Sequence, residues 1–287
     1  MSGIRIVTDT ASDITAQQAQ QMNVRLVPLS IAFGERKMPM ESEEDFQSFF
    51  EQLYEERELP TTGQPSPEAY LNEYREAEKN QEDVLVLTLS GGLSGTIRSA
   101  QVAKELSGYD RVTILDTRQA ILTQRMLVER AVLRRSQGRS VEEIAEELLE
   151  ARDRLVVCGV LDTLTFLRKG GRIPAGFDVI GNVLALKPII ELKDGALIKL
   201  GVARGQRKGR EYLFKEFEAA PVDPEWPVYT GYTYDRKLGE DFYRETCERF
   251  GLSAARMYPV GGVIGTHVGK NCAALAFARK APLGGQV

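Results

Sequence analysis

The sequence predicts an α/β protein of two domains, an N-terminal domain on a doubly wound, mostly parallel sheet and a C-terminal mixed α/β domain. Short apolar runs alternate with helical segments up to about residue 153, which is typical of a parallel sheet. After that point the pattern changes, and a hairpin signal appears in the second half. In a chain of 287 residues we therefore expect one domain over 1–153, a second over 154–287, and a ligand cavity at their junction.

In the first domain, strand and helix signals follow one another closely. The run DVLVLTL at 83–89 is almost wholly apolar, which indicates a strand covered on both faces. Ser66 and Pro67 supply an N-cap and a first helical residue. We expect strands at 4–8, 24–33, 83–89 and 112–116, and helices at 43–58, 67–79, 96–106, 118–137 and 140–153.

In the second domain, the clearest signal is a hairpin over 188–203. Its Asp194-Gly195 pair lies between two alternating runs. We also expect strands at 155–161, 226–234 and 255–260, a short helix ending at LRKGG, and helices near 175–185, 205–219 and 235–250.

The composition excludes several classes of protein. No apolar stretch approaches the roughly 20 residues that span a bilayer, and the start resembles no signal peptide. Three widely spaced cysteines favour a reducing, cytoplasmic setting over a disulfide framework. The chain has one histidine and no CxxC pair, so we expect no metal site. A net charge of -4 argues against nucleic-acid binding.

That single histidine, His267, lies in the glycine-rich segment GGVIGTHVG, where glycines would allow a strained loop beside a ligand. The turn SGGLSGT at 90–96 follows an apolar run and opens a helix, so its N–H groups could bind an anion. It lacks the lysine of a P-loop and misses the GxSxG spacing of a nucleophile elbow by one residue. An acyl hydrolase or transferase using Ser94 and His267 remains an alternative.

Two other polar segments have weaker signals. DTASD, with Asp9, Thr10, Ser12 and Asp13, follows the first strand; we expect Ser12 or Asp13 to cap the next helix rather than to bind ligand. PTTGQPSP at 60–67 should be an ordered loop without a regular element, whose threonines could donate to an oxyanion.

Two basic stretches, LRKGGR at 167–172 and ARGQRKGR at 203–210, stand out in an acidic chain. The second has four cations in eight residues. Solvated surface is the default interpretation of such runs, and a docking face or phosphate contact is the functional one. A DNA-associated regulator acting through 203–210 is a further alternative, which the acidic charge and the lack of a helix-turn-helix signal disfavour.

Taken in order, these motifs resemble the DegV family of fatty-acid-binding proteins. The resemblance covers essentially the whole chain and rests on VTDTASD, PTTGQPSP, LTLSGGLSGT, LRKGGRI, LKPIIELKDG and VIGTHVG. It implies two α/β domains that enclose a long-chain fatty acid, without catalysis of their own. It also implies a partner, an ATP-dependent fatty-acid kinase chain that forms an acyl phosphate for phospholipid synthesis. No cofactor is expected, and only transient membrane contact.

Position by position, the resemblance assigns the ligand carboxylate to Thr61, Thr62, Ser90, Ser94 and His267. Gly63 and Gly91 stand where family loops usually have serine, so two hydroxyl donors are missing, and Lys270 follows closely on His267. We therefore expect His267 to matter more than usual. The residues expected to dock the kinase are Arg172, Arg204, Arg207 and Lys208.

Overall fold

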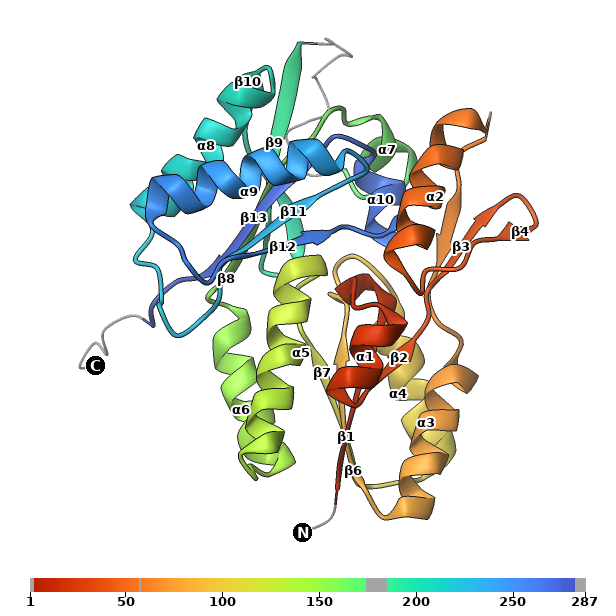
Figure 1. Cartoon of the computed structure of the whole chain (residues 1–287). Coiled ribbons are helices and arrows are strands. Elements are labelled where there is room, and N and C mark those ends of the chain that lie inside the picture. The colour runs from red at the N-terminus through yellow and green to blue at the C-terminus, as the bar shows by residue number, and fades with distance from the viewer. Residues whose placement is uncertain (1–2, 57, 174–184, 282–287) are drawn as a thin grey trace.

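A four-stranded parallel sheet organises the first half of the chain (Figure 1). The computed structural model describes residues 3–56, 58–173 and 185–281. The sheet order is β2-β1-β6-β7, with bounds β1 Ile4–Asp9, β2 Val24–Val27, β6 Asp83–Thr88 and β7 Val112–Asp116. Every pairing is parallel. The chain passes from β1 to β2 on one side of the sheet and from β6 to β7 on the other, so the strand order reverses between β1 and β6. Open α/β sheets bind ligands at such a point.

Helices cover both faces of this sheet, so the predicted doubly wound architecture is confirmed. Val7, Val84 and Val86 pack under α3 (Pro67–Asn80) and α4 (Thr96–Ser107). Leu85 and Leu87, which alternate with these residues along β6, lie on the other face of the sheet and pack with α5 (Ile121–Ser136) and α6 (Val141–Arg152). Helix α3 starts as predicted, since the Ser66 hydroxyl accepts the N–H of Ala69 at 3.3 Å. A shorter helix, α1, spans Ala16–Met22.

A small three-stranded sheet was not expected. Its order is β4-β3-β5, with β3 at Ser30–Phe33, β4 at Arg36–Lys37 and β5 at Thr61–Gly63. The run 24–33 is therefore two strands in different sheets, separated at Pro28, which has no N–H to continue a ladder. The prediction of a loop without regular structure at 60–67 was also wrong, because Thr61–Gly63 pairs with β3. Helix α2 (Glu43–Glu55) precedes β5.

The second half of the chain forms a six-stranded mixed sheet, as predicted in kind. Its order is β10-β9-β8-β13-β11-β12, with bounds β8 Leu155–Val160, β9 Leu186–Lys193, β10 Ala196–Arg204, β11 Tyr229–Tyr232, β12 Arg256–Pro259 and β13 Ala273–Ala278. Its helices are α7 Thr165–Lys169, α8 Gln206–Ala219, α9 Arg236–Phe250 and α10 Gly262–Val268. The hairpin at Asp194-Gly195 is confirmed as β9–β10.

Strand β13 was missed, although it lies in the middle of this sheet. Its sequence, AALAFA, is rich in alanine, which has a low preference for strands. The helix expected near 175–185 falls mainly on 174–184, outside the described residues. The boundary between domains 1–153 and 154–287 remains a prediction. The strands within residues 4–116 build the parallel and small sheets, and those within residues 155–278 build the mixed sheet.

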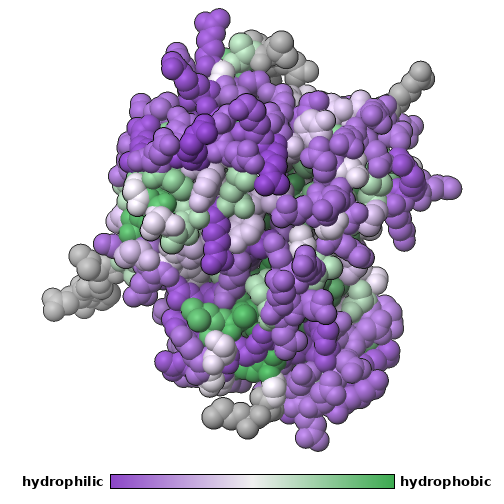
Figure 2. Space-filling model, in the orientation of Figure 1, coloured by the Kyte–Doolittle hydropathy of each residue, from purple (hydrophilic) through white to green (hydrophobic). Residues whose placement is uncertain are grey.

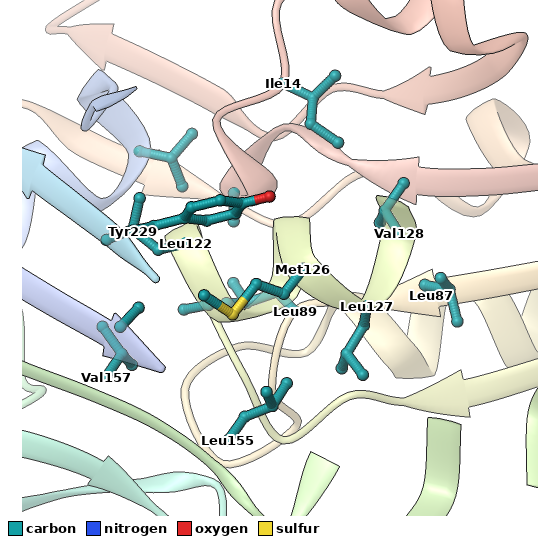
Figure 3. Packing of buried hydrophobic residues seen from close by; sticks show 14 of the residues in the cluster. Ile14, Leu87, Leu89, Leu122, Met126, Leu127, Val128, Leu155, Val157 and Tyr229 are labelled. Atoms are coloured by element: carbon teal, nitrogen blue, oxygen red, sulfur yellow. The ribbon is translucent and has the colours of Figure 1, made fainter. Parts of the chain in front are cut away.

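One apolar cluster joins the two large sheets. Tyr229 and Val157 of the mixed sheet approach Leu122 and Met126 of α5 (Figure 3), and all four belong to the same buried cluster. The opposite face of the mixed sheet is covered by α8 and α9. The two large sheets therefore share one apolar core across the junction.

The surface is mainly polar in the view of Figure 2, with a hydrophobic area in the region of α5 and α6. Leu133 and Leu149, which are among the exposed large apolar residues, belong to these two helices. Within the described residues, no helix is both long and apolar enough to cross a membrane.

Candidate functional site

A cavity of about 260 Å³ lies between the carboxyl edge of the parallel sheet and the mixed sheet. The parallel sheet contributes residues that follow β2, β6 and β7, namely Leu29, Leu89 and Ala120. The mixed sheet contributes Val157, Gly159, Ile190, Leu192, Gly231 and Ala274. The site is therefore at the predicted junction and at the edge where the strand order reverses.

The lining is mostly apolar and also includes Tyr232 and Thr233, and five other polar side chains gather in one part of it. They are Thr62 and Gln64 of the segment after α2, Ser94 of the turn before α4, Arg172 after α7, and His267 of α10. Their neighbours in the lining include Leu93, Leu167, Val263, Ile264 and Val268. The cavity can thus hold a molecule with one polar end and an apolar body.

His267 lies on a short helix, α10, and not in the strained loop that its glycines suggested. Those glycines permit close packing instead. A Cβ atom on Gly265 would lie 2.5 Å from the ring of Phe50, and one on Gly262 would lie 2.7 Å from Phe49. Only glycine fits at these two positions, so α10 lies directly against α2, and His267 is carried to the cavity by that contact.

The imidazole of His267 is neutral at physiological pH. Burial, together with the positive charge of Arg172, lowers its pKa from 6.5 to about 4. Its Nε2 atom shares a hydrogen bond with Thr62 Oγ1 at 3.1 Å, and the tautomer decides which atom donates. Its Nδ1 atom is buried without a hydrogen-bond partner and faces Gly170, where a Cβ atom would lie 2.2 Å away. The ring is therefore fixed in place and acts as a hydrogen-bonding group rather than a cation.

Arg172 provides the positive charge at this end of the cavity. Its side chain is exposed, and it donates to the carbonyl of Leu93 at 3.1 Å and to that of Gly170 at 2.7 Å. It therefore lies where the polar end reaches solvent, beside His267. The docking role that the sequence suggested for Arg172 stays a prediction; the structure places its exposed side chain in the lining of the cavity.

Ser94 lines the cavity, but it has no nucleophile geometry. Its hydroxyl shares a hydrogen bond with Thr96 Oγ1 at 2.9 Å, while His267 is engaged by Thr62. A serine nucleophile needs its base within hydrogen-bond reach. The contacts of both residues therefore favour binding over hydrolysis.

Two of the predicted carboxylate binders are not brought to the cavity lining. Thr61 is exposed and points to the other side of β5 from Thr62, because side chains alternate along a strand. Ser90 is fully buried, and its hydroxyl donates to the carbonyl of Gly195 at 2.7 Å and accepts the N–H of Gly92 at 3.2 Å. Ser90 thus fastens the tip of the β9–β10 hairpin to the parallel sheet.

The two glycines that replace serines have structural reasons. A Cβ atom on Gly63 would lie 2.5 Å from Ser30 Oγ, and one on Gly91 would lie 2.7 Å from Asp116 Oδ2. Lys270 does not line the cavity; its ammonium lies 3.7 Å from the centre of the Tyr54 ring. A side chain at either position would therefore require Ser30 or Asp116 to move, and Lys270 points to an aromatic ring instead of the cavity.

The DTASD segment is structural, as expected, but the capping residues differ from those predicted. Asp9 accepts the N–H of Leu89 at 2.6 Å and caps the short 3₁₀ helix Thr10–Ser12, and Thr15 caps α1. Ser12 donates to the carbonyl of Asp9 at 2.8 Å. Asp13 instead accepts the N–H of Gly261 at 3.0 Å, which ties this segment to the start of α10.

Gln64 was missed by the sequence reasoning. Its Nε2 donates to Ser99 Oγ at 3.0 Å, and its Oε1 occupies the space that a Cβ atom on Gly95 would need. The proximity of Gln64 to the threonines was a usable signal. The position of Arg172 in the lining had no such signal, because a basic run is ordinarily interpreted as solvated surface.

The second basic stretch is at the surface. Arg204, Arg207 and Lys208 are exposed at the end of β10 and the start of α8. Gln206, between them, donates to the carbonyl of Asn271 at 2.7 Å, four residues beyond His267. Within the ranges that the structure describes, no group of three or more histidine, cysteine, aspartate or glutamate residues is placed to hold a metal ion.

Comparison with known proteins agrees with this geometry. Residues 3–280 match a family described as uncharacterised proteins of the DegV family. The chain belongs to the DegV family. A DegV domain-containing protein of Caldanaerobacter subterraneus subsp. tengcongensis is 30% identical over 290 residues, covering 98% of this chain and 100% of that protein.

Solved DegV structures have the same fold. A DegV family protein from Thermus thermophilus, described by its fatty acid binding, has a TM-score of 0.86 and 32% identity and covers 97% of this chain and 100% of its own. A DegV lipid binding protein from Thermotoga maritima has a TM-score of 0.86 and 25% identity, with 97% and 100% covered. The combination of a parallel and a mixed sheet is thus shared with these structures.

Proposed function

We propose that this protein binds a long-chain fatty acid in the junction cavity and presents its carboxylate to a separate ATP-dependent kinase. The observation that carries the proposal is the distribution of polarity in the cavity, with Thr62, Ser94, Arg172 and His267 together and mostly apolar side chains elsewhere in the lining. The Thermus thermophilus protein, which is described by its fatty acid binding, supports the same ligand class.

The two parts of such a ligand would do different work. A tail of about 15 methylene groups, at about 0.8 kcal/mol each, gains up to about 12 kcal/mol before the cost of association. A buried carboxylate is costly unless it is hydrogen-bonded or paired. Thr62, Ser94 and neutral His267 offer hydrogen bonds, and Arg172 offers the charge. The tail therefore supplies affinity, and the polar end fixes the orientation.

The protein itself would be a non-catalytic subunit. The kinase would phosphorylate the presented carboxyl group, and the acyl phosphate would enter phospholipid synthesis in the cytoplasm. Arg172, exposed at the polar end, supports access of a second protein to the carboxylate. The proposed docking cations are the exposed residues Arg172, Arg204, Arg207 and Lys208.

Lipid analysis tests the proposal directly. The purified protein is examined by native mass spectrometry, its lipids are extracted, and the delipidated protein is titrated with oleate. We expect a co-purifying fatty acid at one per chain and saturable binding of oleate. The proposal would be overturned if no fatty acid co-purified with the protein and the delipidated protein did not bind oleate. A kinase chain with ATP then tests presentation, with acyl phosphate as the product measured.

A further inference from the structure

Three small residues form a row across the cavity face of the mixed sheet. Gly231 of β11 lies opposite Ala274 of β13, and Ala274 lies opposite Gly159 of β8. Directly opposed residues of neighbouring strands point to the same face of a sheet. All three line the cavity, so the row lies open to it.

Larger residues close both ends of this row. On β12, Tyr258 lies opposite Gly231, and its ring contacts that of Tyr229 with centroids 5.0 Å apart. On β9, Ile190 lies opposite Gly159. The row is therefore a trough that crosses three strands, roughly 9.5 Å from the first to the third at the usual strand spacing.

Larger residues also border the trough along the strands. Val157 and Tyr229 lie two residues before Gly159 and Gly231, on the same face, and pack toward Leu122 of α5 (Figure 3). Glycine inside a strand weakens it and often marks the close approach of another group. Two glycines in one transverse row therefore indicate that something apolar comes close to this part of the sheet.

The two glycines differ in the space around them. A Cβ atom on Gly231 would lie 3.0 Å from Leu122 Cδ1, so protein atoms already fill that position. A Cβ atom on Gly159 would have no protein atom closer than 3.4 Å, and its nearest side-chain neighbour would be Ala274 at 3.8 Å. The absence of a side chain at Gly159 is thus not required by packing in the protein, and it adds depth to the cavity.

We propose that the Gly159–Ala274 part of this trough seats part of the acyl chain and sets the length of chain that the protein prefers. This inference rests on the proposed function. A side chain added at Gly159 would occupy space that several methylene groups would otherwise fill. Chains too short to reach the trough would not be affected, so the loss of affinity should grow with chain length.

The test compares decanoate, myristate and stearate as ligands of the wild type, Gly159→Ala and Gly159→Leu. Each methylene that is displaced costs about fourfold in affinity. We expect about fourfold weaker stearate binding for Gly159→Ala, which adds one carbon, and about 250-fold for Gly159→Leu, which adds four, with decanoate changed much less. Gly3→Leu is the matched control, since Gly3 is exposed at the start of β1 and a Cβ atom there has only ordinary contacts.

The inference would be overturned if Gly159→Leu bound each of the three ligands as tightly as the wild type does. It would also be overturned if Gly159→Leu lost the same factor of affinity for all three. If Gly159→Leu does not fold, Gly159→Ala and the opposite change, Ala274→Gly, decide the question; the latter should strengthen stearate binding relative to decanoate. A wild-type protein that binds none of the three would instead overturn the proposed function itself.

Discussion

The Nε2 atom of His267 lies 3.1 Å from the Oγ1 atom of Thr62, which joins two residues 205 positions apart in the chain. One is on β5 of the small sheet and the other on α10. This contact fixes the polar end of the cavity, and it holds an imidazole whose pKa is far below the usual value. The predictions below follow from that arrangement and from its neighbours.

The charge state of His267 can be measured directly, because it is the only histidine in the chain. In ligand-free protein its single Hε1 resonance should titrate at a pKa of about 4, since burial disfavours the charged ring. A bound carboxylate favours the charged form, so oleate should raise that pKa. An NMR titration of both forms checks this. A ligand-free midpoint near 6.5 would contradict the description of a buried, neutral ring.

His267→Ala should weaken fatty-acid binding more than Ser94→Ala does. The Ser94 hydroxyl is already shared with Thr96, and the glycines at 63 and 91 add no side-chain donor. Loss of a hydrogen bond to a charged group costs about 1.5–3 kcal/mol, or roughly 10- to 150-fold in affinity. We expect His267→Ala in that range and Ser94→Ala below it, measured by titration calorimetry. A larger loss for Ser94→Ala would reverse the ranking.

Gly170→Ala should displace the histidine ring without removing any polar group. A Cβ atom there would lie 2.2 Å from His267 Nδ1, so either the ring or the backbone after α7 must move. We expect at least tenfold weaker oleate binding, the value of one lost hydrogen bond to a charged group. The Hε1 shift of His267 should change with it. Gly3→Ala serves as the control. Unchanged binding with an unchanged shift would show that the site tolerates the methyl group.

Removing the charges of Arg204, Arg207 and Lys208 should separate binding from presentation. These side chains are exposed and do not line the cavity, so a triple change to glutamine should leave oleate affinity within twofold. The rate of acyl-phosphate formation by the kinase should fall at least tenfold. That rate should also depend more strongly on salt concentration in the wild type than in the triple variant. Combined loss of oleate binding and acyl phosphate would indicate a defect of folding instead.

Asp13→Asn should change the dependence of stability on pH. Burial raises the pKa of Asp13 from 3.8 to about 7, against the opposing effects of the Gly261 N–H and of Arg125, with neighbouring Asp9 raising it further. Between pH 3.8 and about pH 7, Asp13 therefore keeps its proton in the native state and has lost it in the unfolded chain. The stability from this group is complete below pH 3.8 and declines as the pH rises to 7.

Asparagine cannot ionise, and its oxygen can still accept the Gly261 N–H. Relative to wild type, Asp13→Asn should therefore gain a few kcal/mol in the free energy of unfolding between pH 4.5 and pH 7.5. Urea unfolding at the two pH values measures the difference, with exposed Asp110→Asn as the control. Parallel changes in wild type and Asp13→Asn would contradict the raised pKa of Asp13.

Most of the fold could be predicted because periodicity and capping are local. The apolar run at 83–89 predicted a buried strand, and Ser66-Pro67 predicted the start of a helix; both were confirmed. Elements that depend on distant partners were missed. The strand Thr61–Gly63 exists because it pairs with Ser30–Phe33, and Ala273–Ala278 is a strand because β8 and β11 lie on either side of it.

The site was only partly predictable for the same reason. Thr62, Ser94 and His267 were identified and line one cavity. Thr61 and Ser90 were separated from it by strand alternation and by the Gly195 carbonyl, which no local pattern shows. Arg172 was predicted to dock a partner, which stays a prediction, but nothing in the sequence indicated that it also lies in the cavity lining near His267.

The position of β13 between β8 and β11 has a consequence for biosynthesis. As the chain leaves the ribosome, the parallel sheet can form early, but the mixed sheet stays in two pieces until residues 273–278 emerge. Until then β8 and β11 each have an open edge, which is a hazard for aggregation. Ala274, the middle of the trough, belongs to that strand, so the trough is complete only once residues 273–278 have joined the sheet.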